Sequence, residues 1–286
     1  MNSSDGAPSS PLPRWGRPFF EPGGGDPFLF YVVFGDFSAL SGDAAGTAEI
    51  AAGMSRAVYR SEGPPPGVEV ARYRRAEHPD WFAGFLGGQI GRLLDDELGA
   101  SGAAAAVRAA PDCIALVGSI ADPPTLDYLR DTVGVLTFLS DRGGAALLDA
   151  FGLRWWAPDA WRRAIFEPDE PAPLRHVEIL VSEDAPGPNG GKTVWLHTRG
   201  MRTFGRPDLS VPGVGPAHVN GAIDLCNRFI VWQALGGVVP EGQLVSLPGL
   251  PAGTTCHHAG SVDDPNFNNR HLEIRWPGAT PPPAGI

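Results

Sequence analysis

The chain has 286 residues, of which 43% are hydrophobic and 19% are charged, and its formal net charge is −10. This balance is typical of a globular protein and argues against an intrinsically disordered one. An acidic chain does not attract phosphate backbones over its whole surface, so nucleic acid is disfavoured as a partner. The 21 arginines against one lysine are typical of a GC-rich genome, so the arginines alone do not indicate a site.

The cysteines and the N-terminal sequence bear on the compartment. Cys113, Cys226 and Cys256 have no regular spacing, which favours reduced thiols over a disulfide framework. The N-terminus lacks the basic start and apolar run of a secretory signal. No stretch approaches the roughly 18 apolar residues that span a bilayer. We therefore expect a cytoplasmic protein that makes no use of a membrane.

Composition divides the chain into four segments. Residues 1–27 and 277–286 are rich in Pro, Gly and Ser, and such segments bury too little apolar surface to offset their ordering entropy. We expect both to be flexible tails. Between them we expect two α+β subdomains, at 28–150 and 151–276.

Apolar periodicity predicts the elements of the first half. Strands are expected at 27–34, 67–74, 112–120 and 145–150, and helices at 80–98 and from 126 to about 141. The helix at 80–98 contains four glycines, each of which costs roughly 1 kcal/mol against alanine. We therefore expect another element to pack very closely against it.

The second half follows a similar pattern. A short helix is expected at 158–166, strands at 176–184 and 193–201, a long helix at 217–235, and short strands near 243–247, 254–259 and 271–276. Helices and strands alternate irregularly, and neighbouring strands often lie within hairpin distance. This predicts an α+β fold with mixed or antiparallel sheets and helices packed on one face.

The stretch GPNGGKT, at 187–193, ends like a phosphate-binding loop. Such a loop needs glycine at position 186 and a helix that starts at Lys192, whereas the chain has Pro186 and continues into a predicted strand. No helix N-terminus would therefore face a phosphate. The stretch predicts a hairpin loop instead.

The most distinctive run is WLHTRGMRTFGRPDL. On a strand, His197 and Arg199 point to the same face, and Arg202, Arg206 and Asp208 follow within a few residues. The three arginines are candidates for binding a carboxylate or phosphate group bidentately. In the alternative, Arg206 and Asp208 pair with neighbours to hold an irregular loop, and His197 is a hydrogen-bonded structural residue.

This run also carries a resemblance. HTRGMRTFGRPDL, together with the downstream LCNRF, resembles bacterial domains of unknown function in which a strand runs into a Gly-Met-x-x-Phe-Gly-x-Pro-acid-Leu turn. The resemblance covers at most the C-terminal half. It implies a similar α+β domain and assigns no activity, cofactor or catalytic residue.

A second candidate site lies in TTCHHAGSVDDPNFNNRHLEIRW. On strands, Cys256 and His258 share a face, as do His271 and Glu273. These side chains are of the types that bind zinc, but their spacing matches no standard zinc motif. The alternative is that the histidines are structural and that the Asp- and Asn-rich segment between the strands is a hairpin loop.

Two functions are compatible with these patterns, and the sequence leaves open whether the protein is an enzyme. The first is a non-catalytic binding module for a protein partner or a small anionic ligand, with no cofactor. The second is a hydrolase that uses His197, Cys256, His258, His271 and Glu273, with or without zinc. The hydrolase hypothesis predicts that at least three of these side chains converge in one pocket. The sequence does not fix the oligomeric state.

Overall fold

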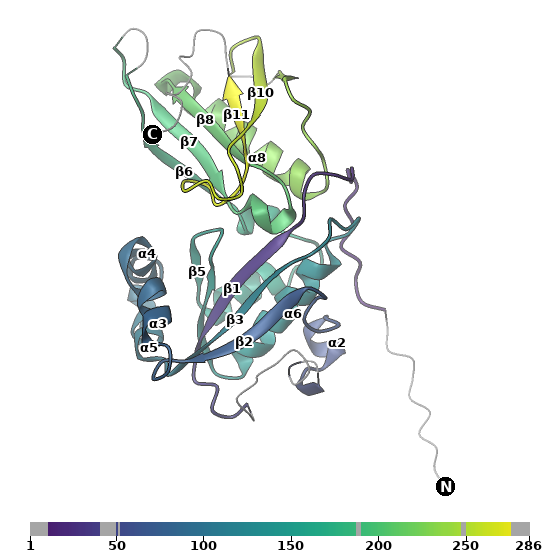
Figure 1. Cartoon of the computed structure of the whole chain (residues 1–286), viewed down its shortest axis with the longest axis vertical. Helices are drawn as coiled ribbons and strands as arrows, with labels where there is room; N and C mark the ends of the chain where they lie inside the picture. Colours follow the sequence, from purple (N-terminus) through teal and green to yellow (C-terminus); the bar gives the residue numbers. More distant parts are fainter. Residues whose placement is uncertain (1–10, 41–49, 51, 187–189, 247–249, 276–286) are drawn as a thin grey trace.

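The computed structural model describes residues 11–40, 50, 52–186, 190–246 and 250–275. Within them the chain forms two β-sheets and seven α-helices, so the α+β class expected from the sequence is confirmed. Figure 1 shows one sheet in each half of the molecule. Residues 1–10 and 276–286, which include the first part of the expected N-terminal tail and all of the expected C-terminal tail, lie outside the described residues.

The first sheet has five antiparallel strands. Their spatial order is β2 (Val68–Arg74), β3 (Asp112–Ser119), β1 (Phe28–Gly35), β4 (Gly144–Asp149) and β5 (Arg154–Trp156). Strand β1 is central because its run FLFYVVF is apolar on both faces. Tyr31 and Val33 enter one core cluster, and Val32 and Phe34 enter another. The sheet is therefore packed on both faces.

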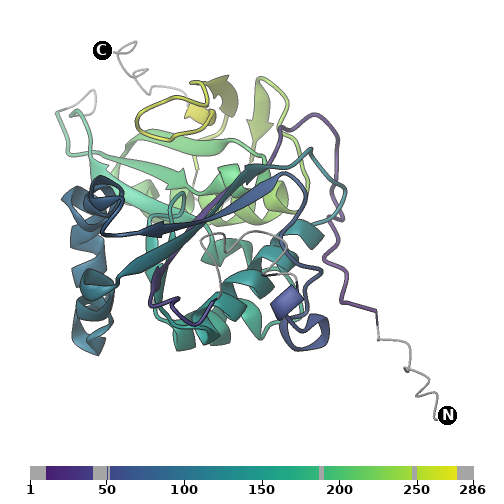
Figure 2. The ribbon, with the colours of Figure 1, turned by 60° about the horizontal axis from the view of Figure 1, so that its bottom comes forward.

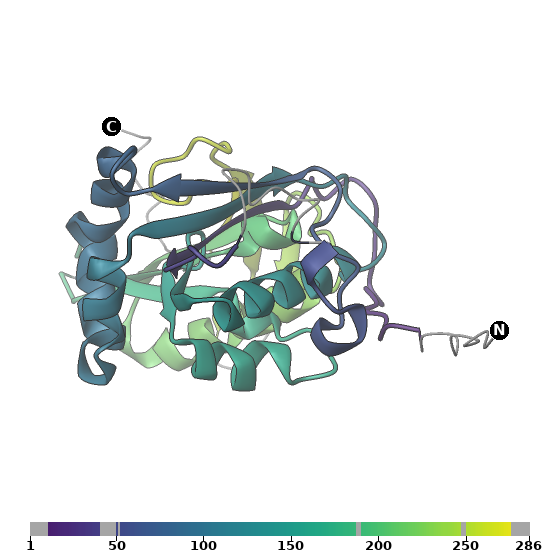
Figure 3. The ribbon, with the colours of Figure 1, turned by 90° about the horizontal axis from the view of Figure 1, so that it is seen from below.

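Helices cover both of those faces. Helices α2 (Arg56–Tyr59), α6 (Asp127–Asp141) and α7 (Pro158–Trp161), with a π-helical turn at Arg162–Phe166, pack on the side of Tyr31 and Val33. Helices α3 (Pro79–Leu86), α4 (Gly88–Leu98) and α5 (Ala103–Ala109) pack on the other side. Figure 3 shows this second group as a column at one end of the sheet.

The single helix expected at 80–98 is wrong, because it breaks at Gly87. That residue is extended, with φ −107° and ψ 178°, and Gly88 takes a positive φ of 58°. A Cβ on Gly91 would lie 2.2 Å from the carbonyl oxygen of Leu86. The glycines thus permit a turn between two helices, and the close contact at Gly91 is with the end of the preceding helix.

The second sheet has six strands and one covering helix. The strand order is β6 (Glu178–Glu183), β7 (Val194–Arg199), β8 (Asp208–Val214), β11 (His271–Arg275), β10 (Thr254–Ala259) and β9 (Gln243–Val245). Among the described strands, only β8 and β11 pair in parallel. Helix α8 (Val219–Ala234) packs on one face through Leu225 and Cys226. Strands β6 and β7 pair antiparallel, which confirms the predicted hairpin, although residues 187–189 of its loop lie outside the described residues.

The two halves share one core. The cluster around Tyr31 continues through Phe204 to Ile230 and Ala234 of α8, so this helix packs on the second sheet with one side and on the first half with the other. Figure 1 and Figure 2 show the green and yellow strands of the second sheet beside the purple to teal strands of the first. The boundary expected at 150 stays a prediction, although β5 and α7 lie beyond it and pack with the first sheet.

The segment before β1 is not a flexible tail where the structure describes it. Trp15 and Arg17 are buried, and the indole Nε1 of Trp15 donates to the carbonyl oxygen of Asp169 at 2.8 Å. The Phe19 amide donates to the carbonyl oxygen of Leu235 at the end of α8 at 3.0 Å. The buried side chains of Trp15 and Arg17 and this backbone hydrogen bond hold the Pro- and Gly-rich segment on the surface.

Candidate functional site

Arg206 holds three segments together and is not a ligand-binding residue. Its side chain is fully buried, and its guanidinium donates to the carbonyl oxygens of Gly236 (3.0 Å), Gly237 (3.2 Å) and Glu21 (3.2 Å) and to Oδ1 of Asp122 (3.1 Å). The fifth hydrogen bond is donated to the carbonyl oxygen of the preceding residue, Gly205. Because arginine has five N–H donors, none remains for a ligand.

Asp208 is likewise structural. The buried carboxylate accepts hydrogen bonds from Thr198 Oγ1 (2.9 Å), the Met201 amide (3.3 Å) and Asn269 Nδ2 (2.8 Å). Burial raises the pKa of Asp208 to about 7, and these hydrogen bonds act in the opposite direction. The carboxyl fixes the turn between β7 and β8. The alternative reading of the sequence, in which Arg206 and Asp208 hold an irregular loop, is the one that the geometry matches.

His197 lies in an aromatic stack on the face of the second sheet opposite α8. Its ring stacks on Trp195 with centroids 4.0 Å apart and meets Phe267 edge-on at 5.6 Å, and Phe267 stacks in turn on His271 at 4.2 Å. Burial, and to a smaller extent Arg199, lowers the pKa of His197 to about 4. The imidazole is therefore neutral at physiological pH and packs as an aromatic ring.

Arg199 and Arg202 both reach the loop between β10 and β11. Arg199 donates to the carbonyl oxygen of Asn266 (2.6 Å), and Arg202 donates to that of Asn268 (2.8 Å). The guanidinium carbon of Arg202 also lies 4.7 Å from the ring centroid of Phe28, a cation–π distance. Each arginine uses a single guanidinium nitrogen for these loop contacts.

A pocket of about 210 Å³ opens where the two halves meet. We call it the seam pocket, and it is lined by Gly25, Asp26, Phe28, Ser119, Arg202, Gly205, Val262, Asn269 and Arg270. These residues come from the segment before β1, the first residue of β1, the end of β3, the turn after β7 and the β10–β11 loop. The pocket therefore exists only when both sheets are assembled.

Two cations of the seam pocket have no carboxylate partner within ion-pair distance in the described part of the chain. Arg270 is exposed and donates through one nitrogen to the carbonyl oxygen of Gly24 at 3.1 Å. Arg202 is half-buried; burial lowers its pKa, and the more distant Asp263 acts in the opposite direction. Asp26 also lines the pocket, and its Oδ1 accepts a hydrogen bond from the Asp122 amide at 3.1 Å.

The four predicted metal ligands do not form one site. The antiparallel register of β10 and β11 pairs Cys256 with Ile274 and His258 with Leu272, so these side chains lie on the α8 face of the sheet. His271 and Glu273 alternate with those partners along β11, so they lie on the opposite face. Within the described ranges, no group of three or more His, Cys, Asp or Glu side chains is placed to hold a metal ion.

Neither Cys256 nor His258 is placed to bind a metal or to act as a nucleophile. Burial raises the pKa of the Cys256 thiol to about 12, far from the range in which a thiolate attacks. The His258 Nε2 hydrogen bonds to the carbonyl oxygen of Val239 at 2.7 Å. The antiparallel pairing of β10 and β11 confirms that the segment between them is a hairpin loop.

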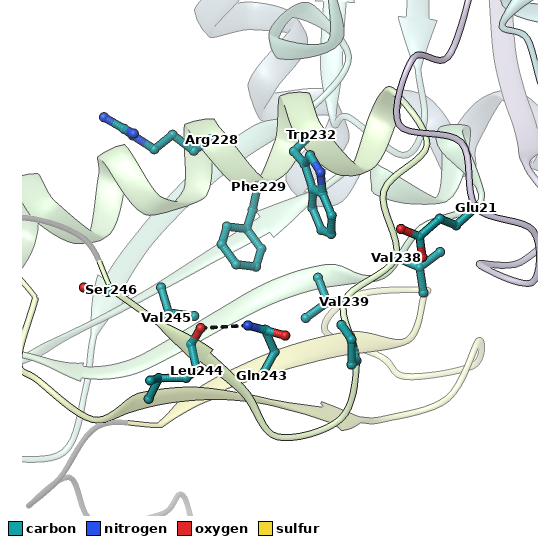
Figure 4. Close-up of a pocket in the computed structure, with 11 residues that line it drawn as sticks. Glu21, Arg228, Phe229, Trp232, Val238, Val239, Gln243, Leu244, Val245 and Ser246 are labelled. Carbon is teal, nitrogen blue, oxygen red and sulfur yellow. Dashed lines mark hydrogen bonds between the residues drawn. The ribbon is translucent and has the colours of Figure 1, made fainter.

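A larger, mainly apolar groove of about 520 Å³ lies between α8 and the edge strand β9. We call it the edge groove. Figure 4 shows Phe229 and Trp232 descending into it from α8, with Val245 of β9 pointing towards them and the Leu244 side chain on the far side of the strand. Arg228 and Glu21 lie at its opposite ends (Figure 4).

Sequence reasoning missed the second arginine of the seam pocket and the whole edge groove. Arg270 stands alone between asparagines and a histidine, so no motif marks it. Phe229 and Trp232 follow a helical spacing that also predicts ordinary core residues. Of these residues, only Arg202 was marked by the sequence, because it lies in the distinctive run WLHTRGMRTFGRPDL.

The chain matches no protein-family model, no curated protein and no solved structure in the comparisons made with each. The resemblance to bacterial domains of unknown function therefore stays a prediction. Across the described ranges, no helix has both the length and the apolar character that crossing a membrane requires.

Proposed function

We propose that the protein is a non-catalytic binding module that holds a small carboxylate- or phosphate-bearing ligand in the seam pocket. One observation carries the proposal: Arg202 and Arg270 line the same pocket of an acidic chain, and the described residues supply neither with a carboxylate at ion-pair distance. Such cations are stabilised by an anion from outside the chain, which forms charge-assisted hydrogen bonds with them.

The remaining donors of these arginines suit such an anion. Each guanidinium is held by one backbone carbonyl oxygen, which leaves further N–H groups in a planar fork for bidentate binding. The partial burial of Arg202 strengthens an ion pair there, because solvent screens it less. The contact with Phe28 fixes the plane of the guanidinium.

The other lining groups narrow the ligand class. The volume of about 210 Å³ lies below the roughly 300–1,000 Å³ of pockets for drug-sized ligands, so the ligand is small. One carboxylate oxygen of Asp26 is used by the Asp122 amide, and the second can accept a hydrogen bond from a hydroxyl group. A small hydroxy acid or a phosphorylated polyol combines both features.

The hydrolase alternative gains no such support. Its residues are divided between two faces of the second sheet, and the Cys256 thiol is held protonated by burial. The three cysteines are unpaired and buried, which fits the cytoplasmic location expected from the sequence.

The test is isothermal titration calorimetry with inorganic phosphate and with malate, and with glycerol as the neutral control. We expect heat from one or both anions and none from glycerol. Arg202→Gln and Arg270→Gln should each weaken binding at least tenfold, which corresponds to about 1.4 kcal/mol. Binding should also raise the free energy of unfolding, by about 2.7 kcal/mol at a ligand concentration of 100 Kd.

A matched control uses Arg163→Gln, because Arg163 is exposed and lies outside the seam pocket. It should bind the anion as the wild type does. Failure of every anion to bind the folded wild type, or wild-type affinity in both pocket variants, would contradict the proposal. Circular dichroism of each variant separates lost binding from lost folding.

A further inference from the structure

The edge groove lies beside an open edge of the second sheet. Strand β9 pairs with β10 on one side, and no strand of the described residues pairs with its other side. Leu244 in this strand is 61% exposed on the face away from α8, whereas the half-buried Phe229 and Trp232 stand over the α8 face of the strand (Figure 4). An unpaired edge next to apolar side chains is a site at which another strand can add.

The charges at the ends of the groove identify what covers it. Arg228 and Glu21 are exposed, and neither side chain has an ion-pair partner in the described ranges. They lie at opposite ends of the groove (Figure 4). A two-fold rotation reverses left and right along the groove, so it brings the positive end of one copy to the negative end of the other. The surface is thus complementary to itself.

We propose that a second copy of this chain covers the edge groove, with β9 of each copy antiparallel to β9 of the other about a two-fold axis. Each copy's Arg228 then faces the partner's Glu21, twice per dimer. Phe229 and Trp232 of both copies then lie on the α8 face of the joined sheet, and Leu244 of both copies lies on its opposite face. Two six-stranded sheets become one continuous sheet, and the open edge at β9 disappears.

The test is sedimentation velocity over a range of concentrations. The wild type should sediment with about twice the chain mass of 30.2 kDa. Leu244→Asp should shift it to the monomer, because it places two like charges close together where β9 of one copy pairs with β9 of the other. Since Leu244 is largely exposed in the single chain, this change should leave the fold intact, which circular dichroism checks.

Charge reversal tests the arrangement itself. Arg228→Glu and Glu21→Arg should each weaken the dimer at least tenfold, because each opposes like charges twice. The double variant Arg228→Glu/Glu21→Arg should recover most of the lost affinity. The bond from Arg206 to Glu21 uses the backbone carbonyl oxygen, so the reversal does not remove it.

The other edge of the same sheet supplies the control. Val181 of β6 is 54% exposed, and Val181→Asp should leave the dimer unchanged. A wild type that is monomeric at every concentration would overturn the proposal. So would a dimer that dissociates with Val181→Asp but not with Leu244→Asp, or a double charge reversal that fails to recover affinity.

Discussion

Asp208 links the stability of the fold to pH. Burial raises its pKa to about 7, above its ordinary value of 3.8, so the folded state holds the proton more tightly than the unfolded chain does. The resulting stabilisation is complete below the unfolded pKa and is lost as the pH rises through the folded pKa. His197, whose pKa is lowered to about 4, acts with the opposite sign.

Asparagine does not titrate, so we expect Asp208→Asn to remove the pH dependence of stability that Asp208 causes. Between about pH 4 and pH 8, the free energy of unfolding of the wild type should fall relative to that of the variant by on the order of 1–3 kcal/mol. Urea unfolding at several pH values measures this difference. The contribution of His197 is common to both proteins and cancels. Parallel pH profiles would contradict the assignment.

For single residues, the sequence indicated which side chains matter better than it indicated which residues they contact. It marked Arg202, Arg206 and Asp208 as a group. The ion partner of Arg206 is Asp122, which lies far away in sequence, and Arg270 reaches the seam pocket from the last hairpin. Long-range pairs of this kind leave no local pattern, so the division between structural and ligand-facing arginines became visible only in the fold.

At the scale of elements, the α3–α4 turn separates two glycines with different roles. A Cβ on Gly91 would lie 2.2 Å from the Leu86 carbonyl oxygen, whereas one on Gly84 would meet nothing within 4 Å. Gly91→Ala should lower the free energy of unfolding by about 1–3 kcal/mol, because the backbone must shift. Gly84→Ala should raise it by up to about 1 kcal/mol through helix propensity. Chemical denaturation measures both, and effects of equal sign would contradict this account.

Elements with a strong apolar pattern were predictable, and those that depend on distant partners were not. Strands β1 and β3 are continuous apolar runs, and each lies within two residues of its expected range. Strand β8, with the sequence DLSVPGV, contains Pro and Gly, which argue against a strand locally. It forms because β7 and β11 pair with its two sides.

At the scale of the whole molecule, Arg206 connects the N-terminal segment, the loop before α6 and the end of α8. Arg206→Met should leave several buried carbonyl oxygens without donors and lower the free energy of unfolding by about 3–5 kcal/mol. Calorimetry should show one transition in the wild type, because one core spans both sheets. Arg92→Met, an exposed position on α4, should change stability by less than about 0.5 kcal/mol. Equal losses in both variants would refute the role of Arg206.

The parallel pair of β8 and β11 has a consequence for biosynthesis. Strand β11 lies between β8 and β10 in the sheet, yet roughly 55 residues separate it from the end of β8 in the chain. At about 5–20 residues per second, a ribosome needs ~3–11 s to add them. During that interval β8 presents an unpaired edge, and β10 cannot yet be joined to β8 because β11, which lies between them, is missing. The nascent chain is therefore most prone to aggregate just before β11 emerges, and a chaperone that covers β8 would act in that window.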